Sequence, residues 1–184
     1  SRHAPGPRSV KTADDRAIIG NAMPDYTFGL TNTFSYKGFS LDALFTGSQG
    51  NDILNATRID LEQMIGPENQ STAVLDRWTT TNTITDIPRV GDTNSKLVSS
   101  KFVEDGSYIR LKSATLGYSF KNEFLGLKFL KLYATGQNLI TWTNYSGFDP
   151  EVGSSNDTKG VGRGIDYGTY PQVRTFIVGL KAGF

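Results

Sequence analysis

Hydrophobic and polar residues alternate along five stretches of the chain, and this period of two predicts β-strands. In the last stretch, Phe176, Val178 and Leu180 occupy one face, whereas Thr175 and Lys181 occupy the other. The alternation predicts strands at about 26–36, 39–49, 107–120, 127–142 and 173–184. Short connections between successive strands favour antiparallel pairing. The pattern therefore predicts an all-β, antiparallel fold.

The alternation gathers a large set of apolar and aromatic side chains on one face. Such a face can cover a soluble core, or it can face lipid around an aqueous lumen. The terminal Phe184 favours lipid, because aromatic rings gather at the membrane–water interface, where the neighbouring carboxylate stays hydrated. The residues expected to face lipid are Phe28, Leu30, Phe34, Leu41, Phe45, Leu116, Tyr118, Leu130, Leu132, Phe176, Val178, Leu180 and Phe184.

One of the predicted strands breaks the alternation. Between 107 and 120, Leu116 and Tyr118 have the parity of the apolar face. Arg110 and Lys112 share this parity, so an unbroken strand would place two cations on the same face. Either a β-bulge near Lys112 reverses the phase, or the first half of the strand rises beyond the apolar zone, where a charge costs little.

The connections between the predicted strands alternate in length. Lys37-Gly38 and 121–127 are short, whereas 50–106 and 143–172 are long. In an antiparallel meander the short connections fall at one end and the long ones at the other, as in outer-membrane barrels with brief periplasmic turns and long extracellular loops. Residues 1–25 would then form a further extracellular loop. Since barrels of this kind begin at eight strands, five strands indicate the C-terminal part of a larger barrel.

Short helices are expected inside the first long loop. Asn51 or Asp52 could cap a segment that carries Ile53, Leu54, Leu61 and Met64. Ser71 or Thr72 could cap a second segment over 73–78. No other regular structure is expected in 50–106 or 143–172.

Composition narrows the class of protein further. The formal net charge of +1 argues against a nucleic-acid surface, and the absence of cysteine excludes thiolate metal sites and disulfides. No run of about 20 apolar residues occurs, so only a closed barrel could take this chain across a bilayer. The first residues do not form a signal peptide, and we expect that the true N-terminus lies upstream or was removed.

Eight sequence blocks, in unbroken order from about Asp14 to Phe184, resemble the C-terminal end of the SusC/RagA family of TonB-dependent outer-membrane transporters. The blocks are GNAMPDYTFG (20–29), FSYKGF (34–39), GSQGND (47–52), FVEDGSYIRLK (102–112), TLGY (115–118), QNL (137–139), YSGFDPE (145–151) and GIDYGTYPQ (164–172). A series of eight blocks is much more specific than any one of them.

The resemblance implies the last five strands of a 22-stranded barrel that imports glycans or peptides through the outer membrane of Bacteroidetes. It implies a SusD-like surface lipoprotein as a lid over the barrel mouth. It also implies energy supplied by TonB–ExbB–ExbD through an N-terminal plug that this chain does not contain. No cofactor is expected.

Several residues in or beside the long outer loops are candidates for contact with substrate or partner: Trp78, Tyr108, Trp142, Tyr145, Tyr167, Tyr170, Arg77 and Asp149. Aromatic rings can stack on a sugar or on a peptide side chain, or they can simply hold the loops together. The substrate stays open, because both ligand classes suit such rings.

Catalysis finds little support in the sequence, and we expect no enzyme. His3 is the single histidine, so no Ser-His-Asp arrangement is possible away from the first residues. Asp149, Glu151 and Asp157 could bind calcium through oxygen atoms, but their spacing matches no EF-hand loop.

Two other functions fit the pattern. A soluble all-β carbohydrate-binding module would use Trp78 and Trp142 as its platform. A passive porin would share the barrel but lack the plug and the lid.

Overall fold

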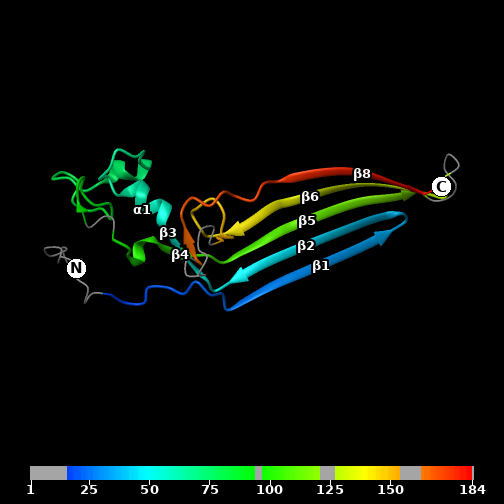
Figure 1. The fold of residues 1–184 in the computed structure, drawn as a ribbon, viewed down its shortest axis with the longest axis horizontal. Coiled ribbons are helices and arrows are strands. Elements are labelled where there is room, and N and C mark those ends of the chain that lie inside the picture. The colour runs from blue at the N-terminus through cyan, green and yellow to red at the C-terminus, as the bar shows by residue number, and fades with distance from the viewer. Residues whose placement is uncertain (1–15, 94–96, 121–126, 154–162, 184) are drawn as a thin grey trace.

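The computed structural model describes residues 16–93, 97–120, 127–153 and 163–183. Its main body is one five-stranded antiparallel sheet with the order β1-β2-β5-β6-β8 (Figure 1). The strands are β1 (Tyr26–Tyr36), β2 (Phe39–Gln49), β5 (Tyr108–Phe120), β6 (Phe129–Thr143) and β8 (Thr175–Gly183). The antiparallel β fold predicted from the alternation is confirmed, and each strand begins and ends close to its expected range.

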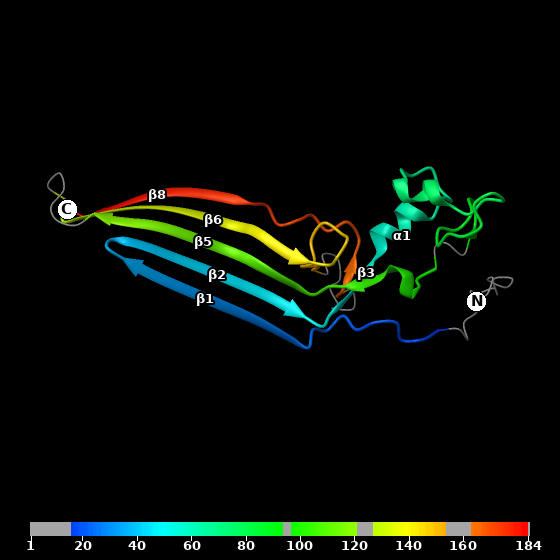
Figure 2. The same cartoon turned by 180° about the vertical axis from the view of Figure 1, so that it is seen from behind.

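The described residues of the two long connections fold together at one end of this sheet, opposite the turn between β1 and β2 (Figures 1 and 2). We call them the loop subdomain. It contains a three-stranded sheet of order β4-β3-β7, formed by β4 (Val103–Asp105), β3 (Asp52–Asn55) and β7 (Ile165–Asp166). Its helices are α1 (Ala56–Glu62) and the 3-10 helices η2 (Thr72–Asp76) and η4 (Ser100–Phe102). No described helix has the length and apolar character needed to cross a membrane.

The small sheet corrects the expectation that the long connections lack strands. Ile53 and Leu54 lie in β3 and not in a helix, because Leu54 pairs with Val103 of β4 and with Ile165 of β7. The helix therefore begins later, and its cap is Asn55, whose side chain accepts a hydrogen bond from the Arg58 N–H at 2.9 Å. The second predicted cap is confirmed: Ser71 accepts from the Ala73 N–H at 3.2 Å and begins η2.

The strand register places most of the apolar residues of the five strands on one face, with Leu44 and Ile177 as exceptions on the other. One row runs from Tyr36 through Phe39, Tyr118 and Leu132 to Leu180, and the neighbouring rows repeat the arrangement. These side chains are not covered by any element of the described residues, and Phe176 and Val178 are 74% and 85% exposed. The opposite face carries rows of polar residues such as Thr46, Arg110 and Thr141.

A β-bulge at Lys112 keeps the two faces separate. Leu111 pairs with Phe45, but Ser113 pairs with Leu44, so Lys112 is the extra residue of β5. The register also shifts between Leu111 and Ser113 against β6. The bulge predicted as one of two alternatives is therefore confirmed: it reverses the phase of the strand, and Arg110 and Ser113 both lie on the polar face.

Two glycines of the β1–β2 hairpin differ in their surroundings. An ideal Cβ built on Gly47 would lie 2.4 Å from the Phe28 ring and 2.8 Å from the backbone oxygen of Tyr108. A Cβ on Gly29 would meet no atom within 4 Å. The missing side chain of Gly47 therefore lets the Phe28 ring and the backbone of β5 approach closely, whereas no atom approaches Gly29 in this way.

We expect Gly47→Ala to destabilise the full-length protein by about 1–3 kcal/mol, because the backbone of β5 must shift to admit the methyl group. The matched change Gly29→Ala should alter the free energy of unfolding by less than about 0.5 kcal/mol. Denaturant midpoints of the two variants test this pair. Equal midpoints would show that the approach of Phe28 and β5 to Gly47 has no energetic consequence.

Candidate functional site

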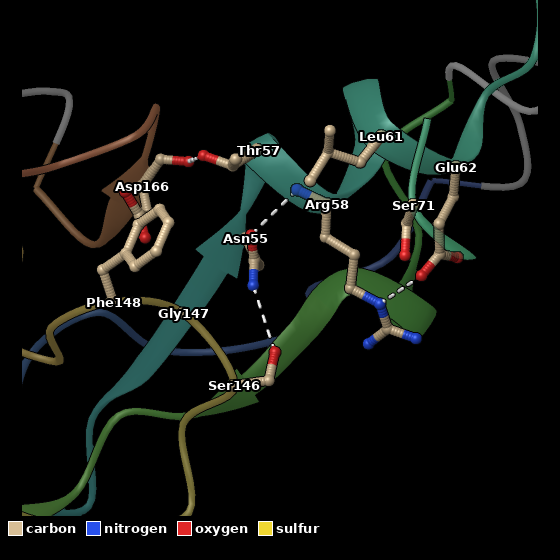
Figure 3. A pocket seen from close by; sticks show the side chains of 10 residues that line it. All are labelled: Asn55, Thr57, Arg58, Leu61, Glu62, Ser71, Ser146, Gly147, Phe148 and Asp166. Carbon is tan, nitrogen blue, oxygen red and sulfur yellow. Dashed lines mark hydrogen bonds and ion pairs between the residues drawn. The ribbon is translucent and has the colours of Figure 1, made fainter. Parts of the chain in front are cut away.

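A pocket of about 280 Å³ opens in the loop subdomain (Figure 3). It lies where β3, α1, β7 and the segment after β6 meet, so residues far apart in the sequence contribute to it. The lining residues are Asn55, Thr57, Arg58, Leu61, Glu62, Ser71, Ser146, Gly147, Phe148 and Asp166. Leu61 and Phe148 are the apolar side chains of this set, and Phe148 is 75% exposed.

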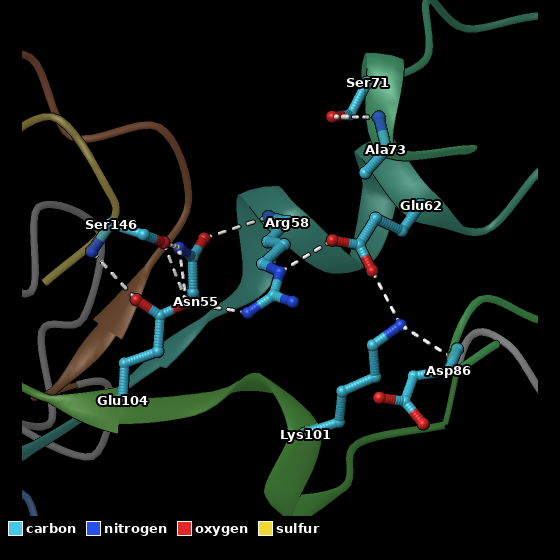
Figure 4. A network of polar contacts seen from close by, with 9 residues as sticks. All are labelled: Asn55, Arg58, Glu62, Ser71, Ala73, Asp86, Lys101, Glu104 and Ser146. Atoms are coloured by element: carbon cyan, nitrogen blue, oxygen red, sulfur yellow. Dashed lines mark hydrogen bonds and ion pairs between the residues drawn. The ribbon is translucent and has the colours of Figure 1, made fainter. Parts of the chain in front are cut away.

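Glu104 of β4 joins three segments beside this pocket (Figure 4). Its Oε1 accepts hydrogen bonds from Arg58 Nη1 at 3.1 Å, from Ser146 Oγ at 2.9 Å and from Asn55 Nδ2 at 3.3 Å. Its Oε2 accepts from the Ser146 N–H at 2.9 Å. One carboxylate therefore ties β4 to α1 and to the segment after β6.

Glu62 at the end of α1 forms the second centre of the network. Its Oε1 lies 2.6 Å from Arg58 Nε, and its Oε2 lies 2.7 Å from Lys101 Nζ. Lys101 also donates to the backbone oxygen of Asp86 at 3.2 Å. Two cations neutralise this buried carboxylate and connect α1 to η4.

Both carboxylates stay ionised in the folded protein. Burial opposes the charge of Glu104, but hydrogen bonds from Ser146 and Arg58 outweigh it and lower the pKa of Glu104 below its ordinary value. Burial likewise opposes the charge of Glu62, while Lys101 and Arg58 lower its pKa overall. The network therefore depends on deprotonated Glu62 and Glu104.

A buried ion pair fixes the segment after β6 against the polar face of the long sheet. Arg110 of β5 is 1% exposed, and its Nη2 donates to Asp149 Oδ1 at 2.5 Å. Arg110 Nη1 donates to Glu151 Oε2 at 3.1 Å, and Lys112 Nζ lies 3.5 Å from the same oxygen. Burial opposes the charge of Asp149, but hydrogen bonds from the Gln172 and Glu151 N–H groups and from Arg110 lower its pKa.

A second buried contact holds the other end of this segment. The Tyr145 hydroxyl donates to Asp166 Oδ2 at 2.6 Å, and Asp166 Oδ1 accepts from the Thr169 N–H at 2.8 Å. Burial and the neighbouring Asp166 carboxylate raise the pKa of Tyr145, so its hydroxyl remains a donor. Thr57 of α1 donates to the backbone oxygen of Asp166 at 3.2 Å.

The structure separates the residues predicted for contact with substrate or partner. Trp78, Tyr167 and Tyr170 are exposed in the loop subdomain, and Arg77 is half-buried there. Tyr108 is half-buried, with the Arg110 guanidinium 5.5 Å from its ring centroid. None of these residues lines the pocket described above.

The other three candidates are buried or lie on the long sheet. Tyr145 and Asp149 are buried and hold the loop through Asp166 and Arg110. Trp142 lies in β6 opposite Ile109, on the apolar face of the sheet. Trp78 and Trp142, the platform of the alternative carbohydrate-binding module, therefore belong to different parts of the structure.

Two of the three calcium candidates, Asp149 and Glu151, lie among the described residues. Asp149 pairs with Arg110, and Glu151 pairs with Arg110 and Lys112, so both carboxylates already have cationic partners. The described residues contain no group of three acidic or histidine side chains suited to a metal. Asp157 lies outside the described residues, as do His3 and Phe184.

Sequence reasoning missed the pocket itself. Phe148 lies in YSGFDPE, a block that carries the family resemblance, but the sequence favours Tyr145 and Asp149 of the same block as contact residues. An aromatic residue between Gly147 and Asp149, in a loop rich in Gly and Asp, is the signal available in this block. Asn55, Arg58 and Asp166 carry no local signal, because only long-range pairing brings them together.

Comparison with known proteins supports a common origin over nearly the whole chain. No protein-family profile matches the chain. The chain is 42% identical over 185 residues to TonB-dependent receptor P3 of Formosa agariphila. This alignment covers 97% of the chain and 18% of that receptor. The chain is 29% identical over 176 residues to TonB-dependent receptor SusC of Bacteroides thetaiotaomicron, covering 92% of the chain and 16% of that receptor.

The fold is similar to solved structures as well. The RagAB peptide importer in its closed-closed state matches with a TM-score of 0.83 and 29% identity, over 96% of this chain and 19% of that one. A second structure, of the RagAB peptide transporter, gives a TM-score of 0.83 and 30% identity, over 98% of this chain and 20% of that one. The chain thus spans about a fifth of the length of the relatives that it matches.

We expect Arg110→Met to free the segment 145–153 in the full-length protein, because Asp149 would keep a buried charge without its cation. Loss of one partner of a buried pair costs about 3–5 kcal/mol, so amide hydrogen exchange in this segment should accelerate at least about a hundredfold. Lys112→Met, which removes an exposed cation near Glu151, should change exchange little. Equal exchange in both variants would contradict the anchoring role of Arg110.

The lowered pKa values of Glu62, Glu104 and Asp149 predict a loss of order in acid. Their stabilising contribution is complete above the unfolded carboxyl pKa of about 4 and disappears as the pH falls through the lower folded pKa. Exchange protection of 55–62 and 145–149, corrected for intrinsic rates, should hold at neutral pH and fall below about pH 4. Glu104→Gln should weaken the dependence of this protection on pH. Protection that is lost only at alkaline pH would contradict the prediction.

Proposed function

Because the chain belongs to the SusC/RagA family of TonB-dependent outer-membrane transporters, we propose that it forms the C-terminal part of the barrel wall of an outer-membrane importer. The observation that carries this proposal is the uncovered apolar face of the five-stranded sheet, opposite a polar face. Such an apolar face is stable in contact with lipid, and the polar face then lines a water-filled lumen.

The open edges of the sheet support a longer barrel. Among the described residues, β1 and β8 each pair with one neighbouring strand, so each keeps one unpaired edge. Unpaired backbone groups are too costly in a bilayer, so further strands must complete the wall. The family resemblance suggests a barrel of 22 strands, of which this chain supplies five.

The orientation follows from the two ends of the sheet. The turn at Lys37-Gly38 faces the periplasm, whereas the loop subdomain and residues 16–25 face the outside of the cell (Figure 1). Residues 1–15 of the predicted extracellular loop lie outside the described residues. This assignment rests on the rule that periplasmic turns are short and extracellular loops are long. It places the pocket and the exposed Trp78, Tyr167 and Tyr170 at the mouth of the barrel.

In this scheme an oligosaccharide or a peptide enters from the mouth, below a SusD-like lipoprotein lid. TonB–ExbB–ExbD would act through an N-terminal plug encoded outside this chain. The similar RagAB structures are described as a peptide importer, which supports import as the activity of the whole protein. The residues of this chain serve in binding and passage and not in catalysis.

A soluble carbohydrate-binding sandwich accounts less well for the structure. A sandwich buries its apolar face against a second sheet. In the part of the chain that the structure describes, the second sheet is the three-stranded sheet of the loop subdomain. It lies at the end of the long sheet and does not cover its apolar face (Figure 1). Among the described residues, no layer covers the exposed row that ends at Leu180.

Charge substitutions in the full-length protein test the proposal. Leu180→Arg places a cation on the apolar face, where the membrane cost reaches about 2–4 kcal/mol, and we expect it to block outer-membrane assembly. Thr175→Arg, on the polar face of the same strand, should assemble normally. Thr135 is a poorer control, because its hydroxyl lies 2.8 Å from that of Thr115.

The measurement is the amount of heat-modifiable, folded barrel in outer-membrane fractions. Leu132→Arg should behave like Leu180→Arg, since the two leucines pair across β6 and β8. If the leucine variants and Thr175→Arg assemble equally well, the apolar face does not contact lipid and the barrel proposal is wrong.

A further inference from the structure

We propose that the pocket of the loop subdomain binds one neutral sugar ring of an oligosaccharide, which stacks on Phe148. This inference rests on the proposed function and assigns a ligand class to a site within the barrel mouth. Figure 3 shows Phe148 beside Asp166, together with side chains of α1, β3 and the segment after β6. The volume of about 280 Å³ suits a small part of a ligand and not a folded partner.

Phe148 is exposed on a segment that is otherwise held firmly. Tyr145 is 6% exposed and bound to Asp166, Ser146 is bound twice to Glu104, and Asp149 is 5% exposed and paired with Arg110. Phe148 lies between these anchors and is 75% exposed. The backbone that carries the ring is therefore ordered before a ligand arrives, which lowers the entropy cost of binding.

The rest of the lining offers hydrogen bonds of both kinds. The hydroxyl groups of Thr57 and Ser146 donate to Asp166 O and Glu104 Oε1, so their oxygens remain able to accept from a ligand. The hydroxyl group of Ser71 accepts from the Ala73 N–H and remains able to donate. Asn55 and Arg58 contribute side-chain amide and guanidinium groups from positions fixed by Glu104 and Glu62. A sugar hydroxyl also donates and accepts, so it can use the capacity that remains, whereas an apolar peptide side chain would use none of it.

The charges disfavour an ionic ligand. Asp166 and Glu62 would repel an anion, and the Arg58 guanidinium is already bound by Glu62 and Glu104. A cation would meet Arg58, while the carboxylate oxygens already hold partners: those of Asp166 accept from Tyr145 and Thr169, and those of Glu62 pair with Arg58 and Lys101. The pocket is therefore complementary to an uncharged polar ligand with one apolar face.

The test uses the full-length protein in detergent, titrated calorimetrically with neutral hexasaccharides of glucose, mannose, galactose and xylose, and with a peptide mixture. At least one saccharide should bind, and Phe148→Ala should weaken that binding about tenfold or more through loss of stacking. Phe148→Trp should keep the affinity. Leu75→Ala removes an equally exposed apolar side chain of the loop subdomain outside the pocket and should leave the affinity within about twofold.

Three results would overturn the inference: no saccharide of the set binds, peptides bind in a Phe148-dependent manner instead, or Phe148→Ala leaves saccharide affinity unchanged. A Phe148→Ala protein that no longer assembles would also overturn it, since the ring would then pack against the rest of the barrel. The importer proposal is judged separately by the Leu180 and Thr175 variants, so a protein that binds sugar through Phe148 without forming a barrel would support the pocket alone.

Discussion

The separation of apolar and polar faces across five paired strands is the constraint on which the rest of the structure depends. Antiparallel register carries one row of large side chains from Tyr36 to Leu180, and a shift of one residue in any strand would send that strand's apolar side chains to the polar face. The bulge at Lys112 protects this separation, because it absorbs one residue where two cations would otherwise break it. Arg110 then becomes available to the loop subdomain.

Arg110 links the wall to the candidate site. It belongs to β5, yet its partners Asp149 and Glu151 follow directly after Phe148 in the segment that lines the pocket. A wall strand thereby determines where a loop residue is presented. The small sheet positions the same segment through two further carboxylates: Glu104 accepts from Ser146, and Asp166 accepts from Tyr145.

The loop subdomain is stabilised largely by charged and polar contacts, with a small apolar core that includes Ile53, Ile59 and Phe102. Each buried carboxylate of the network has a cation or several hydrogen-bond donors, as buried charges require. Such a network orders the loops without a large hydrophobic interior, which leaves apolar side chains such as Phe148 exposed.

The sequence by itself determined the five long strands and the resemblance to the family, because alternation and block order are properties of neighbouring residues. It left the bulge near Lys112 as one of two alternatives, and the strand register decided between them. Only the tertiary structure decided the small sheet, in which Leu54 pairs with Ile165, and the burial of Asp149 against Arg110. Strands of two to four residues are too short to show a period, and an ion pair between distant residues leaves no local pattern. The pocket depends on the small sheet and on this ion pair, because these long-range contacts bring its lining residues together.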